Sequence, residues 1–164
     1  MKTNTIIKTA FLSAFLWINL SVSAQNTFVA KTGDDDFDLT LTELNVSASL
    51  DMGAFKIDMV RTYAVLETKI DDLVVTFGMS AGDIFMTLEL AKHCKKPIAD
   101  VAALYKKNSG KGWGVIAKEL GVKPGSPAFH AMKAASKEKK AKAKSNEPGK
   151  KSAKPVDKGK VKTK

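Results

Sequence analysis

The glycine-rich stretch at residues 110–114 has the residue types of an anion-binding turn. Its glycines would keep side chains away from the start of a predicted helix, so free backbone amides and one lysine could hold a phosphate, sulfate or carboxylate. Alternatively, the glycines only let the tryptophan tuck beneath the preceding helix. A phosphate-binding P-loop is excluded. It needs a glycine where this sequence has Tyr105, and a serine or threonine where this sequence has Gly112. The candidate anion or ligand site comprises Gly110, Lys111, Gly112, Trp113, Gly114 and His130.

Histidine and cysteine are too few and too scattered to predict a catalytic or zinc site. His93 and Cys94 are adjacent, so on a helix their side chains point about 100° apart and cannot act on one atom. His93 follows Glu89 by one turn, a spacing typical of an exposed pair. We interpret Cys94 as a small core residue. We therefore predict no catalytic residue, no metal site and no cofactor.

Three aspartates at alternate positions could open a calcium-binding loop. Asp34, Asp36 and Asp38 have the spacing that begins an EF-hand. The rest of the loop does not follow, because Leu39 stands in place of the glycine and Asn45 in place of the final glutamate. We interpret this stretch as a solvated acidic segment.

The same glycine-rich stretch carries a resemblance. Residues 110–133 read GKGWGVIAKELGVKPGSPAFHAMK. This is similar to the C-terminal motif of a family of small, largely uncharacterised exported bacterial proteins that share a GKGWGxIAKxLGxKPGSxxFHxxK pattern. Weaker similarity extends back to Gly82, so about half of the mature chain is covered. The resemblance implies export and a helical fold, and it implies no activity.

Residues 116–129 also resemble the opening of a helix-turn-helix. The sequence IAKELGVKPGSPAF has the spacing found in many DNA-binding proteins, in which the second helix presents polar side chains to base edges. Here that helix would begin with Pro127, Ala128, Phe129 and His130, which offer little to read a base. A nucleoid-type DNA-binding protein therefore stays an alternative.

The lysine-rich C-terminus is the strongest functional feature of the sequence. Residues 133–164 contain 13 lysines and three carboxylates, whereas residues 25–132 contain 12 basic and 14 acidic side chains. Such a composition predicts disorder, although the part up to Lys144 could become helical against an anionic surface. A lysine-rich chain binds polyanions by counterion release. The predicted polyanion-binding residues are Lys137, Lys139, Lys140, Lys142, Lys144, Lys150, Lys151 and Lys154. A tail that serves only solubility is the alternative.

The N-terminus has the organisation of a secretory signal peptide. Lys2 and Lys8 flank an apolar stretch of residues 9–20, and small residues precede a predicted cleavage site after Ala24. The apolar stretch is shorter than the roughly 20 residues that span a bilayer. We expect a periplasmic or secreted protein with no integral membrane segment after cleavage. A single cysteine then provides no internal disulfide.

Apolar spacing predicts an all-α protein, a small bundle of about five short helices. The predicted organisation is a signal peptide (1–24), a flexible acidic segment (25–36), a helical domain (37–132) and a disordered polycationic tail (133–164). Residues 37–50 alternate as in a strand, but a lone strand would lack a partner, so a helix is favoured. Asp51 is placed to cap a helix, and Ser80 with Asp83 resembles a capping box before a broadly apolar, central helix.

Together these features predict a non-enzymatic exported protein that is tethered to an anionic polymer. The partner would be an anionic polysaccharide, lipopolysaccharide or extracellular DNA, bound through the tail. Besides the DNA-binding alternative, an envelope enzyme or inhibitor with a site near Trp113 and His130 stays open.

Overall fold

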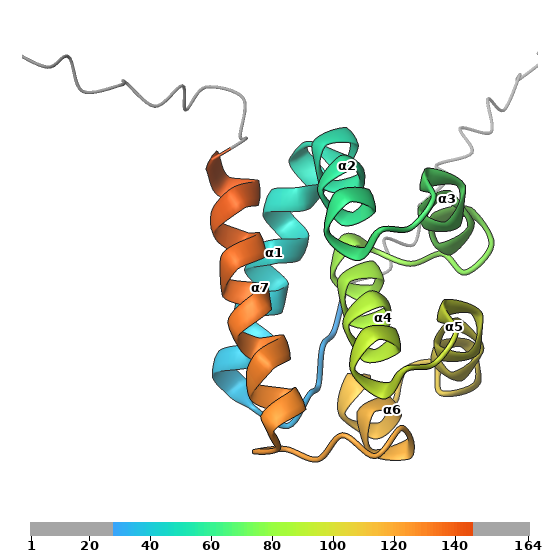
Figure 1. Ribbon diagram of the computed structural model, residues 1–164. Helices are drawn as coiled ribbons and strands as arrows, with labels where there is room; N and C mark the ends of the chain where they lie inside the picture. Colours follow the sequence, from blue (N-terminus) through green and yellow to red (C-terminus); the bar gives the residue numbers. More distant parts are fainter. Residues whose placement is uncertain (1–27, 146–164) are drawn as a thin grey trace, which may run out of the picture.

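The computed structural model describes residues 28–145, and within them the chain forms helices joined by turns (Figure 1), which confirms the all-α prediction. Instead of about five short helices, this part of the chain forms seven. They are α1 (Asp35–Leu50), α2 (Met52–Tyr63), α3 (Glu67–Val75), α4 (Ala81–Cys94), α5 (Ile98–Lys107), α6 (Trp113–Glu119) and α7 (Pro127–Ser145). In the described range, none is long and apolar enough to cross a bilayer.

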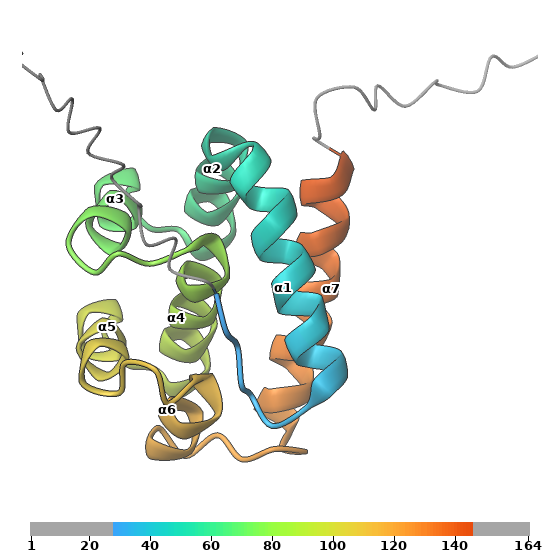
Figure 2. The same ribbon diagram turned by 180° about the vertical axis from the view of Figure 1, so that it is seen from behind.

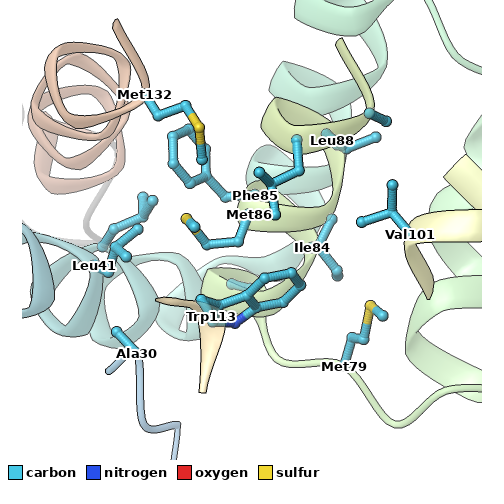
Figure 3. Packing of buried hydrophobic residues seen from close by; sticks show 14 of the residues in the cluster. Ala30, Leu41, Met79, Ile84, Phe85, Met86, Leu88, Val101, Trp113 and Met132 are labelled. Carbon is cyan, nitrogen blue, oxygen red and sulfur yellow. The ribbon is translucent and has the colours of Figure 1, made fainter. Parts of the chain in front are cut away.

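Helix α4 is the centre of the bundle. Every residue from Ala81 to Ala91 is buried, as expected for a broadly apolar helix, and this includes the polar residues Asp83, Thr87 and Glu89. Figure 3 shows its side chains between α1, α7 and the indole of Trp113. The predicted capping box is confirmed, with Ser80 and Asp83 satisfying each other's backbone amides. This buried helix therefore sets the positions of the elements around it.

The segment of residues 37–50 is helical, which resolves the choice between helix and strand. In α1 the buried residues Phe37, Leu41 and Leu44 recur at spacings of three and four. The apparent alternation comes from apolar residues such as Leu39 and Val46, which lie on the exposed face. The predicted cap is also confirmed, because the Asp51 carboxylate accepts the amide of Ala54 at 2.9 Å.

Helix α7 overturns the prediction that disorder begins at residue 133. It continues to Ser145 and lies parallel to α1, and both helices run in the same direction in Figures 1 and 2. Met132, Ser136 and Lys139 are buried at helical spacing on its inner face. The carboxylates of α1 and α2 supply the anionic surface against which a lysine-rich segment can be helical. Residues 146–164 of the predicted tail lie outside the described residues.

The prediction of a flexible segment before residue 37 is also wrong for the part that the structure describes. Residues 28–34, here called the N-terminal strap, lie between α1 and α4 (Figure 2), and Ala30 and Thr32 are buried. Asp34 caps α1 by accepting the amide of Phe37 at 2.8 Å. The strap is held by backbone hydrogen bonds to α6, which composition alone does not reveal. The predicted signal peptide lies outside the described residues.

Candidate functional site

The start of α6 is occupied by the N-terminal strap. The amide of Trp113 donates to the carbonyl of Ala30 at 2.8 Å, and the amide of Gly114 donates to the carbonyl of Lys31 at 2.9 Å. These are amides that the sequence analysis left free for an anion. The Lys111 ammonium donates instead to the side-chain oxygen of Asn108 at 3.2 Å. The turn therefore binds the chain's own backbone.

The close approach of the strap explains two glycines of the motif. A Cβ at Gly114 would lie 2.7 Å from the carbonyl oxygen of Thr32 and 2.8 Å from that of Lys31. Gly112 has a φ of 92°, which favours glycine, and a Cβ there would collide with the Cβ of Lys31. Sequence reasoning missed the strap as the partner of these glycines. The one sequence signal for such a contact was the spacing of the glycines, which leaves one edge of the turn without side chains.

Trp113 is tucked against the preceding helix, as the alternative reading of the glycines predicted. Its side chain is 1% exposed and stacks on Tyr105 of α5, with ring centroids 5.3 Å apart. The indole Nε1 donates to the Asp83 carboxylate at 2.9 Å. The tryptophan therefore joins α6 to both α4 and α5.

Asp83 is the centre of this cluster and has a larger role than helix capping. The residue is 7% exposed, and it accepts hydrogen bonds from Trp113 and from the amide and hydroxyl of Ser80. Burial, followed by the charge and hydrogen bond of Asp83, raises the pKa of Tyr105 to about 12. Tyr105 therefore stays a protonated donor at physiological pH. Several donors satisfy the carboxylate, so its geometry is that of a structural anchor.

An open cavity of about 330 Å³ lies beside this cluster. Its lining includes Lys31 from the strap, Tyr105, Trp113, Gly110 and Gly112. Three residues of the candidate site do not line the cavity: Lys111 is bonded to Asn108, Gly114 contacts the strap, and His130 is exposed on α7 with its ring against Phe129. The structure thus brings Gly110, Gly112 and Trp113 together around the cavity, with Lys31 as its cationic group.

A second buried polar cluster joins α2 to α4. The Glu89 side chain is 1% exposed and accepts from the Tyr63 hydroxyl at 2.6 Å, while His93 lies 3.2 Å from its other oxygen. The expected exposed Glu89–His93 pair is therefore a partly buried one. Burial, with the nearby Glu89 carboxylate, raises the pKa of Tyr63 well above its usual value. Burial also raises the pKa of the Cys94 thiol, which is the opposite of what a nucleophile needs.

The three aspartates of the possible calcium loop are used within the fold. Asp34 caps α1 and binds Lys133, and Asp38 accepts the amide of Thr32 at 2.8 Å. Asp36 pairs with Lys133 at 3.0 Å. Across residues 28–145 no group of three or more histidine, cysteine or acidic side chains is placed to hold a metal ion.

Each lysine of α7 pairs with a carboxylate, and we call this set the ion-pair seam. Hydrogen bonds with Asp34 and Asp36 raise the pKa of Lys133, and Lys133 in turn lowers the pKa of both carboxylates. Glu43 is paired by two lysines, which also lower its pKa. The pairs are Lys133–Asp34, Lys133–Asp36, Lys137–Asp36, Lys139–Asp58, Lys140–Glu43, Lys142–Glu138, Lys142–Asp58 and Lys144–Glu43.

The ion-pair seam separates the predicted polyanion-binding lysines into two groups. Lys137, Lys139, Lys140, Lys142 and Lys144 are engaged by the protein's own carboxylates. Lys139 is only 5% exposed and also contacts the Thr62 hydroxyl. The other three, Lys150, Lys151 and Lys154, lie outside the described residues. Lysines of α7 thus have a structural role that a count of charges did not predict.

Exposed lysines occur instead on α5, on α6 and in the turn between them. Lys106, Lys107, Lys111 and Lys118 are exposed there, and we call this group the α5–α6 corner. Lys107 pairs with Glu119 at 3.3 Å, whereas the other three form no ion pair with any carboxylate in residues 28–145.

The protein was compared with models of known families, with curated proteins and with solved structures, and none of the three comparisons found a match.

Proposed function

We propose that the protein is a non-enzymatic, exported tether that binds anionic polymers through the lysines that its fold leaves unpaired. The observation that carries this proposal is the ion-pair seam. Because the seam engages every lysine of α7, the unpaired positive charge is concentrated elsewhere. Residues 146–164 add seven lysines and only two carboxylates. Lysine ammonium groups bind polyanions by counterion release, with little regard for sequence.

The buried polar clusters favour a binding protein over an enzyme. The carboxylates of Asp83 and Glu89 are engaged by several donors each, and the Cys94 thiol has a raised pKa. The two carboxylates are used to join helices. The charged residues that line the cavity beside Trp113 are Lys31 and Asp83, and the Asp83 carboxylate is already hydrogen-bonded within the fold. An envelope enzyme or inhibitor is therefore less well supported than a tether.

The DNA-binding alternative has little support from α6 and α7. In a helix-turn-helix the second helix enters the major groove and presents polar side chains to base edges. Here α7 packs along α1, and the exposed residues near its start are Pro127, His130, Ala131 and Ala134. Its lysines face carboxylates of α1 and α2. Only diffuse contact with the DNA backbone would be available.

The test compares residues 25–164 with residues 25–145 in a salt titration of fluorescence anisotropy. The shorter protein keeps every described residue, including all of α7, and thermal unfolding verifies that it folds. Labelled alginate and labelled duplex DNA serve as probes. We expect the longer protein to bind both more tightly, and for DNA log Kd should vary with log salt with a slope of about 0.9 per neutralised phosphate. Equal binding by the two proteins, or none by either, would refute the tether.

A further inference from the structure

We propose that the α5–α6 corner is a second polyanion-binding surface, and that its partner is a carboxylate-bearing polysaccharide. The inference rests on the proposed function and deepens it, because it assigns a surface on the folded domain in addition to the lysines after residue 145. The first argument is the segregation of charge. Residues 28–89 contain four basic and 12 acidic side chains, whereas residues 90–126 contain eight lysines and two carboxylates.

The fold keeps this segregation in space. The acidic part of the chain contains α1 and α2, whose carboxylates face the lysines of α7 in the ion-pair seam. No comparable neutralisation occurs at α5 and α6. Helix α5 lies on the opposite side of α4 from α7, and α6 lies beneath the lower end of α4 (Figures 1 and 2). Of the eight lysines in residues 90–126, only Lys92 and Lys107 pair with a carboxylate of the described chain. Apart from Lys31 and Arg61, the cations of the described chain that lack an ion pair therefore lie within residues 90–126.

The corner already holds one carboxylate, which indicates the chemistry of its partner. Glu119 accepts from the side-chain amide of Asn108 at 2.8 Å and from Lys107 at 3.3 Å. The hydrogen bond from Asn108, then Lys107 and the charge of Lys111, lowers the pKa of Glu119. A carboxylate is thus stabilised as an anion at this place. Lys106, Lys111 and Lys118 are left to contact further carboxylates along a polymer.

The residue types favour a polysaccharide over a nucleic acid. The sole arginine of the chain, Arg61, lies on α2, so the corner cannot form the bidentate contacts that favour phosphate. No aromatic side chain is free to stack on a base, because Tyr105 is stacked on Trp113. The amide of Asn108 is already engaged by Glu119. Lysine ammonium groups alone suit a polymer with closely repeated carboxylates.

The experiment uses residues 25–145, so that the lysines after Ser145 do not contribute. The variant Lys106→Gln/Lys111→Gln/Lys118→Gln removes three unpaired charges from the corner. Its matched control, Lys137→Gln/Lys142→Gln/Lys144→Gln, removes the same charge from α7. In the control, Asp36, Glu43 and Asp58 each keep another lysine partner, so the helix should stay in place. Thermal unfolding verifies that both variants fold.

We expect the corner variant to bind labelled alginate about tenfold more weakly at low salt, since each contact charge contributes up to about fivefold in water. The α7 control should retain most of its affinity. Equal losses in the two variants would show that binding follows net charge alone and would overturn the assignment. Tighter binding of duplex DNA than of alginate, lost in the corner variant, would overturn the polysaccharide as partner. Absence of alginate binding by residues 25–145 would overturn the second surface and leave the tail proposal standing.

A variant that binds alginate more tightly would separate the proposed surface from mere loss of folding, because an unfolded variant would not gain affinity. Glu119→Gln removes the internal carboxylate and frees Lys107, so alginate binding should strengthen a few-fold. Glu138→Gln makes the same charge change on α7, where Glu138 pairs only with Lys142, and should strengthen binding less. An equal increase in the two variants, or none at Glu119, would contradict a binding surface at the corner.

Discussion

Replacing Gly114 by alanine tests whether the N-terminal strap is part of the folded core. Gly114 has an ordinary negative φ and lies in the first turn of α6, so helix propensity alone predicts that alanine stabilises the protein by up to about 1 kcal/mol. The structure predicts the opposite. The added Cβ would lie 2.7 to 3.0 Å from backbone atoms of Lys31 and Thr32, which cannot move without displacing the strap.

The expected destabilisation follows from what the strap would lose. Two backbone hydrogen bonds, to Ala30 and Lys31, contribute about 0.5–1.5 kcal/mol each, and overpacking a close contact costs about 1–3 kcal/mol. After subtracting the gain in helix propensity, we expect the free energy of unfolding to fall by about 2–3 kcal/mol. Such a loss is a large part of the stability of a small domain.

Urea unfolding monitored by Trp113 fluorescence measures this effect directly. In residues 25–164 Trp113 is the only tryptophan, because Trp17 precedes them. The control is Gly53→Ala in α2, where the added Cβ would meet only Asp51, at an ordinary 3.5 Å, and should stabilise the protein by up to about 1 kcal/mol. The two substitutions should therefore shift the urea midpoint in opposite directions. A stabilised Gly114→Ala protein would refute the close approach of strap and α6.

Three further predictions concern the buried anchors and the ion-pair seam. Asp83→Ala leaves the Trp113 indole without its acceptor and removes a helix cap, so the free energy of unfolding measured in a urea titration should fall by about 2–4 kcal/mol. An unchanged urea midpoint would contradict the role of Asp83 as an anchor. Lys139→Met keeps the apolar stem but leaves Asp58 with only the distant Lys142. The free energy of unfolding should fall by about 1–2 kcal/mol, less than for a fully buried pair because Asp58 is partly exposed. As a control, Lys137→Met on the exposed side of α7 should have a much smaller effect. Asp34, Asp36 and Glu43 of the seam have lowered pKa values in the folded state, so their contribution to stability is complete above their ordinary pKa values of 3.8 to 4.5 and is lost as the pH falls through the lower folded values. The urea midpoint should therefore decrease progressively below about pH 4.5. This loss should shrink when those carboxylates are replaced by amides.

Local sequence rules were enough for much of the fold. The Asp51 cap, the capping box of Ser80 and Asp83 and the buried character of α4 follow from residue type and spacing over a single turn, and the structure confirms each. The helix of residues 37–50 was favoured for a different reason, since a lone strand would lack a partner, and the structure shows its buried residues at spacings of three and four. Rules of this kind work because caps and apolar faces depend on residues close together in the chain.

The candidate site was predicted less well. The sequence identified Gly112, Trp113 and Gly114 as unusual and offered either an anion site or close packing of the tryptophan. It did not reveal that the partners of the amides of Trp113 and Gly114 are carbonyls of Ala30 and Lys31, some 80 residues earlier. It treated Asp83 as a cap only, although the same carboxylate also holds Trp113, 30 residues later. Such partners become neighbours only when the helices pack, so no local spacing reveals them.

The sequence by itself determined that this protein is helical, that its positive charge lies in the second half of the chain, and where α2 and α4 begin. The tertiary structure alone decided which lysines are available. A lysine-rich segment read in isolation cannot offset the cost of ordering by burying apolar surface, so disorder is the sound prediction from composition. Placing α7 along α1 changes that balance, because Asp34 and Glu43 neutralise its lysines while Met132 and Phe129 are buried. Charge and apolar residues along a chain are fixed by sequence, whereas the pairing of distant charges is a property of the packed structure.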